Sequence, residues 1–179
     1  MRVSRRVTSA DPMLAEPSGN DEWHTPPEYL RAARAVMGGI DCDPASNAIA
    51  QMRVRATVFY TKMTDGLRRP WHGRVWLNPP YSGVNPGKFT DCLLDHVRRK
   101  DVTQAVVLVN ASTETLWFHR LIDLSTVFCL VKGRIAFLRP DGSRANGNRF
   151  GQAIFYVGPN VAGFEQHFGP FGEIGRAHV

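Results

Sequence analysis

The stretch WLNPPYS, residues 76–82, follows a short apolar run and combines an amide side chain, two prolines and a tyrosine. Pro79 and Pro80 cannot donate a backbone hydrogen bond, and they favour extended geometry in the residues before them. The amide oxygen of Asn78 and the carbonyl oxygen of Pro79 are therefore fixed acceptors, with the flat ring of Tyr81 beside them. These groups match the exocyclic amine of a purine.

The two acceptors also define the chemistry. Accepting both hydrogens of such an amine draws the nitrogen lone pair out of conjugation with the ring, so the amine becomes a nucleophile. We interpret Asn78, Pro79, Pro80 and Tyr81 as a catalytic set on this basis. The alternative interpretation is a rigid polar turn, because proline pairs are common in loops and so short a motif arises by chance.

A second polar segment, DCDPAS at residues 41–46, places two carboxylates two residues apart at the end of an expected strand. An ionised carboxylate accepts several hydrogen bonds, so Asp41 and Asp43 could bind ribose hydroxyls or an ammonium group. The alternative is a helix-capping turn in which Ser46 or Asn47 begins a short helix.

A third segment, TDGLRRPW at residues 64–71, places Asp65 in a glycine turn before the WLNPPY strand. An Asp-Gly pair alone indicates a turn rather than a site. Ligands of open α/β sheets bind at the carboxyl ends of the strands, so polar segments that follow expected strands are candidate sites.

Short apolar segments alternate with helical patterns along the chain. The predicted strands are IDCDP, TVFYT, RVWLNPP, QAVVLVN, VFCLVKG and AIFYVG, and the predicted helices are PEYLRAARAVMGG, KFTDCLLDHVRRK and TETLWFHRLIDL. Such alternation predicts an α/β fold with a mostly parallel sheet and helices on both faces. The last two strands are joined by RPDGSRANGNRFG, whose Asp-Gly and Asn-Gly pairs predict an antiparallel hairpin.

Length and composition favour one folded domain. The chain has 179 residues and is 43% hydrophobic, so we expect a single domain over residues 21–179. Residues 1–20 are rich in Arg, Ser, Pro and Asp without periodicity, which predicts a disordered basic arm. No apolar run approaches the roughly 20 residues that span a bilayer, so we expect a cytoplasmic protein without a membrane partner.

Cysteine and charge give two further expectations. Three widely spaced cysteines indicate neither a disulfide framework nor a zinc site. Lys and Arg exceed Asp and Glu by 22 − 16 = 6, which suits a polyanionic partner such as a nucleic acid. The candidate phosphate contacts are Lys132, Arg134, Arg144 and Arg149. The alternative is a solvated basic face.

Taken together, the segments resemble the S-adenosylmethionine-dependent DNA adenine-N6 methyltransferases, most closely the phage and prophage group of DNA N-6-adenine-methyltransferases. The resemblance lies in WHTPPEYLRAA, IDCDPASNA, VFYT, DGLRRPWHGRVWLNPPYS, KFTDCL and GRIAFL, in the correct order between residues 23 and about 138. It implies a Rossmann-like class I methyltransferase fold, S-adenosylmethionine as the cofactor and no metal. It also implies DNA as the partner, with the target adenine flipped out of the duplex, in a bacterial host cell.

The resemblance assigns roles to individual residues. Trp23, Thr25 and Pro26 match the segment that touches the methionine moiety of the cofactor, and Asp65 matches the acidic position that meets its adenine. NPPY matches the catalytic motif, with Asn78 also in contact with the cofactor. The segment DCDPAS matches the cofactor loop through Asp41, Asp43, Pro44 and Ala45.

Two departures from the family pattern leave alternatives open. The usual glycine-rich cofactor loop is replaced by DPASNAIA, which contains no glycine. Residues 38–51 could equally align with the following strand, where a carboxylate binds the ribose. Rival functions are methylation of an RNA amine or a protein glutamine on the same fold, and a nucleic-acid-binding relic that no longer methylates.

Overall fold

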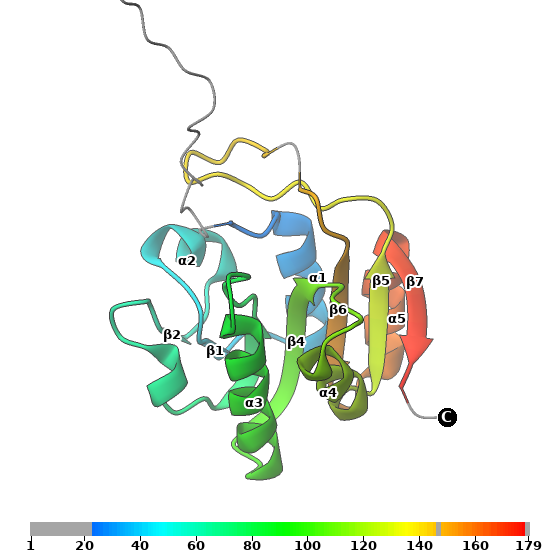
Figure 1. Ribbon diagram of the computed structural model, residues 1–179, viewed down its shortest axis with the longest axis horizontal. Coiled ribbons are helices and arrows are strands. Elements are labelled where there is room, and N and C mark those ends of the chain that lie inside the picture. The colour runs from blue at the N-terminus through cyan, green and yellow to red at the C-terminus, as the bar shows by residue number, and fades with distance from the viewer. Residues whose placement is uncertain (1–22, 146–147, 178–179) are drawn as a thin grey trace, which may run out of the picture.

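A seven-stranded sheet in the order β2-β1-β3-β4-β6-β5-β7 forms the centre of the molecule (Figure 1). The structure is a computed structural model that describes residues 23–145 and 148–177. The strands are β1 (Cys42–Asp43), β2 (Val58–Phe59), β3 (Gly73–Leu77), β4 (Val102–Asn110), β5 (Val127–Val131), β6 (Gln152–Val157) and β7 (Gly172–Arg176). Strands β1 to β5 run one way, and β6 and β7 run the other way. The predicted mostly parallel sheet is confirmed.

Helices cover both faces of this sheet, as the alternating pattern predicts (Figure 1). They are α1 (Pro27–Met37), α2 (Ala48–Val54), α3 (Asn85–Arg98), α4 (Leu116–Leu124) and α5 (Val161–Phe168), with short 3₁₀ helices η1 (Gly66–Arg68) and η2 (Gly169–Phe171). Helices α1 and α5 pack together, and α3 and α4 pack together on the opposite face. Asn47 caps the start of α2 through Ala50 N, as the capping interpretation of this segment expects.

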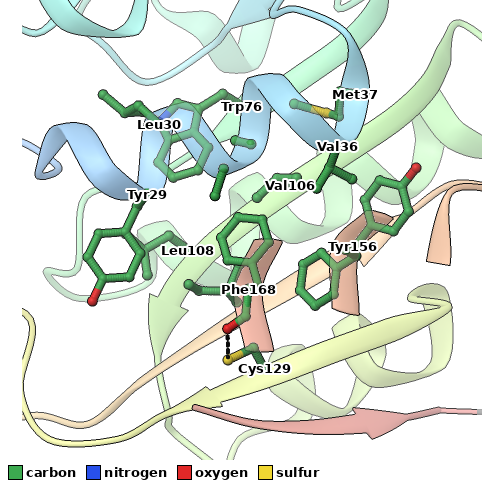
Figure 2. Close-up of a cluster of buried hydrophobic side chains, with 14 of the residues drawn as sticks. Tyr29, Leu30, Val36, Met37, Trp76, Val106, Leu108, Cys129, Tyr156 and Phe168 are labelled. Carbon is green, nitrogen blue, oxygen red and sulfur yellow. Dashed lines mark hydrogen bonds between the residues drawn. The ribbon is translucent and has the colours of Figure 1, made fainter. Parts of the chain in front are cut away.

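The buried side chains form two clusters, one on each face of the sheet. The cluster against α1 and α5 contains Trp76, Tyr156 and Phe168 (Figure 2). The cluster against α3 and α4 contains Val75 and Leu77, on either side of Trp76 along β3. Side chains alternate between faces along a strand, so the next residue after Leu77 points toward α1.

The chain reverses direction across the sheet between β1 and β3. Strand β1 lies between β2 and β3, and the chain goes from β1 to β2 on one side before it returns to β3 on the other. Ligands of open α/β sheets bind at such a reversal, beyond the carboxyl ends of the strands. The ends of β1 and β3 are Asp43 and Leu77, immediately before Asn78.

The carboxyl-terminal strands form an antiparallel unit. Strand β6 pairs antiparallel with β5, which confirms the predicted hairpin, and it also pairs antiparallel with β4. Strand β7 continues the sheet beyond β5, so residues 172–176 belong to the fold. Helix α5, capped by Asn160, did not emerge from the sequence pattern.

Two further sequence expectations concern the amino-terminal arm and a membrane span. The predicted arm at residues 1–20 lies outside the described residues. Within the described ranges, no helix has both the length and the apolar character that a bilayer span requires.

We expect strand β7 to contribute to stability. Deleting residues 172–179 uncovers the edge of β5 over five paired positions and removes Ile174, which packs against the core. The free energy of unfolding in urea should fall by roughly 3 kcal/mol, since each ladder hydrogen bond contributes about 1 kcal/mol net. Deleting only residues 178 and 179 is the control, and equal unfolding midpoints for both deletions would contradict the expectation.

Candidate active site

A cavity of about 410 Å³ lies at the carboxyl ends of β1 and β3, and we call it the first cavity. Its apolar lining includes Trp23, Leu30, Leu67, Trp76 and Phe89. Its polar lining includes Thr25, Asp43, Asn47, Arg53, Lys62, Asp65, Asn78 and Asn85. Residues from the start of α1, the end of β1, helix α2, the loop before β3 and the NPPY segment therefore meet in one place.

The amide of Asn78 is held at both of its polar atoms. Its nitrogen donates to the hydroxyl of Thr25 at 3.2 Å, and its oxygen accepts from the hydroxyl of Tyr81 at 2.5 Å. Thr25 is buried just before α1, on the face toward which strand alternation directs Asn78. The oxygen of the amide is thereby turned toward Tyr81.

Tyr81 packs by its ring edge against Phe137, with ring centroids 6.2 Å apart and planes at 64°. Burial raises the pKa of its hydroxyl above the ordinary value, so the group stays protonated and can donate. The hydroxyl occupies the acceptor that the sequence assigns to a substrate amine. In this structure the Asn78 oxygen is thus already hydrogen-bonded to a donor from its own segment.

Asp43 ends β1 as a buried carboxylate on the wall of the first cavity. It accepts from Gln51 Nε2 at 2.9 Å and from the backbone nitrogen of Ala45 at 3.3 Å. Burial raises its pKa to about 7, although these hydrogen bonds act in the opposite direction. A cationic or hydroxyl-bearing ligand in the cavity would favour its ionised form.

Asp41 points along the same face as Asp43 but lies away from the first cavity, at the other end of β1. Its carboxylate binds Arg74 through two contacts, Nε to Oδ2 at 2.8 Å and Nη2 to Oδ1 at 2.6 Å. The Arg74 partner holds the pKa of Asp41 below its usual range. Asp41 is therefore engaged by Arg74 and does not line the first cavity, because two residues of strand place it roughly 7 Å before the strand end.

Asp65 lies in a left-handed turn that begins η1, and its side chain lines the first cavity. The turn that an Asp-Gly pair predicts is present, and the same residue reaches the cavity. Asp65 accepts from the backbone nitrogen of Leu67 at 3.3 Å and pairs with exposed Arg68 at 3.3 Å.

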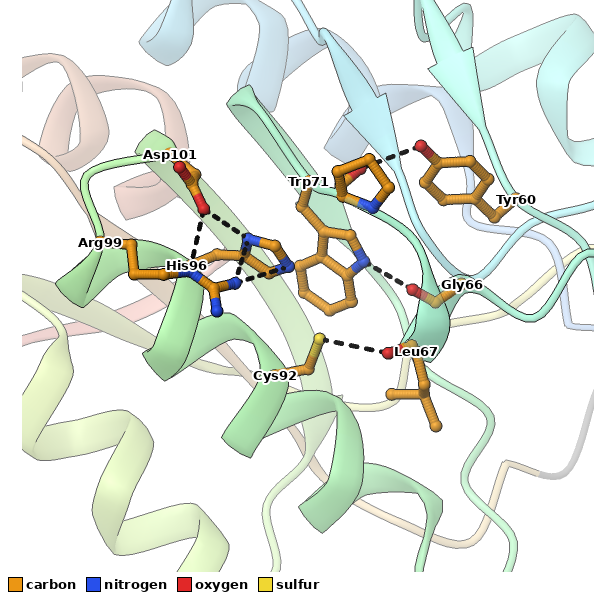
Figure 3. Close-up of polar contacts among 9 residues, drawn as sticks. Tyr60, Gly66, Leu67, Trp71, Cys92, His96, Arg99 and Asp101 are labelled. Atoms are coloured by element: carbon orange, nitrogen blue, oxygen red, sulfur yellow. Dashed lines mark hydrogen bonds and ion pairs between the residues drawn. The ribbon is translucent and has the colours of Figure 1, made fainter.

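The loop that carries Asp65 is anchored by the buried indole of Trp71 (Figure 3). Trp71 donates from Nε1 to the carbonyl of Gly66 at 2.7 Å, and its ring stacks on His96 at 5.4 Å between centroids. Tyr60 donates to the carbonyl of Pro70 at 2.9 Å at the other end of the loop. Side-chain hydrogen bonds thus fix the loop, because it forms no β-ladder with a neighbouring strand.

Gly66 lies directly against the DCDPAS segment. A Cβ atom at this position would lie 1.9 Å from the carbonyl oxygen of Pro44. Only glycine lets the two loops approach so closely. The close approach brings Asp65 and Asp43 to the same cavity.

The remaining expected cofactor residues divide by position. Trp23, Thr25 and Ala45 line the first cavity, and Trp23 is 43% exposed. Pro26 and Pro44 are buried and do not line the cavity. Pro26 immediately precedes α1, and the carbonyl of Pro44 lies against Gly66. Pro79 and Pro80 line the cavity beside Asn78.

A second cavity of about 450 Å³ adjoins the first and shares Trp23, Tyr81 and Ser82 with it. Its other lining residues are Asn110, Ser112, Phe137, Ala145, Asn148, Arg149 and Phe150. The amide oxygen of Asn110 accepts from buried Gln152 at 3.1 Å. Phe150 is 60% exposed at the rim, so the second cavity offers an aromatic wall to a flat ligand.

The four basic residues assigned to DNA are dispersed. Arg149 lines the second cavity, and Arg134 reaches toward Gly151. Lys132 pairs with Glu173, and Arg144 pairs with Glu28 at 3.1 Å. All four are exposed on the segment between β5 and β6, beyond the carboxyl edge of the parallel strands.

Several lining residues escaped the sequence analysis. Asn110 ends β4, so a consistent use of strand ends would have found it. Arg53 and Phe150 carry no local signal, since each is one residue in a helix or a loop. Their neighbours in space come from distant parts of the chain.

A family model described as DNA N-6-adenine-methyltransferase (Dam) matches residues 15–167. The chain belongs to this family. No curated protein and no solved structure matches the chain. As a Dam-family member the chain is an enzyme, a DNA adenine-N6 methyltransferase with a Rossmann-like fold, and membership implies DNA as substrate. Across residues 23–145 and 148–177, no group of three or more His, Cys, Asp or Glu side chains could hold a metal ion.

For this Dam-family protein, Gly66→Ala should disturb the first cavity. The added methyl group meets the Pro44 carbonyl, so we expect a loss of about 1 to 3 kcal/mol in stability and weaker cofactor binding. Gly87→Ala is the matched control. Gly87 lies in α3, and a Cβ there would meet only the side chain of Trp117 on α4, at an ordinary contact distance of 3.7 Å. Urea unfolding and calorimetric titration of both variants measure the two effects. Identical behaviour of the two would refute the close approach.

Asp43 predicts a specific pH dependence of stability. Its pKa of about 7 in the folded protein lies above the ordinary 3.8. The folded state is therefore favoured at low pH, and this contribution declines as the pH rises toward 7, by about 1.4 kcal/mol per pH unit. Asp43→Asn should remove that slope. Urea unfolding of both proteins between about pH 4 and 8 tests this, and parallel pH profiles would contradict it.

Proposed function

We propose that this protein transfers a methyl group from S-adenosylmethionine to the N6 atom of adenine in DNA. The cofactor occupies the first cavity and the flipped adenine occupies the second. One observation carries the proposal: Tyr81, hydrogen-bonded to Asn78, lines both cavities. The proposed catalytic set thus stands where the two ligands would meet.

The first cavity fits the cofactor in size and in chemistry. Its volume of about 410 Å³ falls in the range of small-molecule sites. Asp43 and Asp65 offer acceptors for hydroxyl and amino groups, and Leu67 and Phe89 offer apolar surface for an adenine ring. When bound, the cofactor supplies an electrophilic methyl group on a sulfonium centre.

The second cavity suits a base that has left the duplex. A stacked base cannot present its N6 to the sheet edge, so the adenine must flip out at a cost of a few kcal/mol. The rings of Tyr81, Phe137 and Phe150 can offset part of this cost by stacking. Arg149 lines the same cavity and would contact phosphate.

Asn78 and Pro79 would activate the amine by accepting its two hydrogens. Without substrate, the Tyr81 hydroxyl donates to the Asn78 oxygen at 2.5 Å. The substrate amine would take the place of this hydroxyl as donor, so the Asn78 oxygen has a hydrogen-bond partner before and after binding. Thr25 holds the amide nitrogen, so the oxygen stays in place during this exchange. The amine becomes acidic only as the new bond forms, so positioned acceptors suffice and no strong base is required.

Asn78 provides the direct test of this mechanism. Asn78→Ala should lower turnover on adenine-containing DNA by at least about 100-fold while cofactor affinity stays within a few-fold, because the lost acceptor acts on the adenine. Asn78→Asp keeps an acceptor and should retain intermediate activity. Methyl transfer followed with labelled cofactor, with calorimetry beside it, separates the two effects. Near-normal turnover of Asn78→Ala would show that the site is misassigned.

A further inference from the structure

Arg53 is a lining residue of the first cavity with no role in the account so far. It lies in the last turn of α2, and it is half-buried. Its Nη1 atom is buried and has no hydrogen-bond partner among the residues that the structure describes. A guanidinium carries five donors, and a buried donor without an acceptor is costly.

The position of Arg53 is fixed from two directions. Arg34 on α1 donates to the carbonyl oxygens of Arg53 at 3.1 Å and Val54 at 3.0 Å, so the end of α2 is tied to α1. The guanidinium reaches the 139–145 turn, where its Nη2 would lie 3.1 Å from a Cβ atom at Gly142. The first two bonds fix the backbone at the end of α2, and the closeness to Gly142 places the guanidinium beside the 139–145 turn.

That turn is joined to the segment before α1. His24 and Leu138 exchange backbone hydrogen bonds of 3.0 and 2.8 Å, and Leu138 bridges in turn to Arg144. Arg53 thus lies beside a turn that is bonded to the residue between Trp23 and Thr25, and all three side chains line the first cavity. Asp65 and Lys62 line the cavity from the separate loop before β3.

The carboxylates of the first cavity are committed elsewhere. Asp43 accepts from Gln51 and Ala45, and Asp65 accepts from Leu67 and pairs with Arg68. Neither carboxylate forms a hydrogen bond or ion pair with Arg53 within residues 23–145 and 148–177. Arg53 thus lines the cavity as a cation without a carboxylate partner among the described residues, and a ligand can supply one.

S-adenosylmethionine has one anionic group, the carboxylate of its methionine moiety, and two cationic centres. A guanidinium repels the cationic centres and matches the planar fork of a carboxylate. We propose that Arg53 binds this carboxylate and thereby selects the intact cofactor over analogues that lack it. The proposal rests on the proposed function, because it names a contact for the same cofactor.

Equilibrium binding of two ligands tests the proposal without any activity assay. Decarboxylated S-adenosylmethionine keeps the sulfonium, the ammonium and the nucleoside but lacks the carboxylate. Wild-type protein should bind S-adenosylmethionine about 10- to 100-fold more tightly than the decarboxylated compound, which corresponds to one charge-assisted contact. Arg53→Met should lose this preference by weakening only the S-adenosylmethionine complex.

Two further variants complete the experiment. Arg31→Met is the matched control, because Arg31 is exposed on α1 and belongs to neither cavity lining. Arg53→Lys keeps the charge without the fork, so it should keep part of the preference and serves if Arg53→Met fails to fold.

The outcomes separate this inference from the proposed function. Absence of S-adenosylmethionine binding by the wild-type protein would overturn the proposed function itself. If the wild-type protein binds both ligands equally well, or if Arg53→Met weakens both equally, the carboxylate contact is refuted while the cofactor assignment stands. Loss of DNA affinity in Arg53→Met with unchanged cofactor binding would also overturn it and point to a phosphate contact.

Discussion

The orientation of one amide, that of Asn78, is the constraint on which the proposed chemistry depends. Its nitrogen is taken by Thr25 and its oxygen faces Tyr81, so the acceptor points to the junction of the two cavities. Thr25 comes from 53 residues earlier in the chain. The packing of α1 on the sheet therefore decides which way the amide of Asn78, the proposed catalytic group, points.

The strands at the site are short, and side chains replace the missing backbone ladder. Strands β1 and β2 have two residues each, which is too little to hold the loops that follow them. The Asp41 and Arg74 pair ties the start of β1 to β3, and Trp71 ties the loop of Asp65 to the core. Buried polar groups with satisfied partners fix unique geometry, which a catalytic site requires.

Much of the fold follows from sequence periodicity and turn chemistry. Alternating strands and helices indicate the parallel sheet, and the Asp-Gly and Asn-Gly pairs indicate the final hairpin. Asp43 and Asn78 could be found because they follow strands at the carboxyl edge of the sheet. Asp41 was assigned to the same site because the alternation rule fixes the face of a strand and does not fix the position along it.

The rest of the site depends on contacts that no local pattern encodes. Arg53 lines the first cavity with the NPPY segment, and Phe137 and Phe150 line the second cavity with Tyr81, although these residues lie far apart in the sequence. The hydrogen bond from Tyr81 to Asn78 is likewise not encoded by any local sequence pattern. The sequence predicted a role only for the ring of Tyr81, as a stacking surface. In the structure its hydroxyl also donates a hydrogen bond to the amide oxygen of Asn78.

The raised pKa of Asp43 couples the cofactor site to pH. A buried carboxylate that titrates near neutral pH is ionised more readily when a cation binds beside it. The first cavity would thus gain negative charge as a positively charged ligand enters. Arg53 at another part of the wall balances that charge, and the two side chains match a ligand with groups of both signs.

The most direct measurement is a crystal structure of the protein with S-adenosylhomocysteine and a duplex that contains the target adenine. We predict an extrahelical adenine in the second cavity, with N6 about 3 Å from the amide oxygen of Asn78 and the Tyr81 hydroxyl moved off that oxygen. A complex in which the adenine lies elsewhere, or in which Tyr81 still occupies Asn78 while the base is bound, would contradict the account.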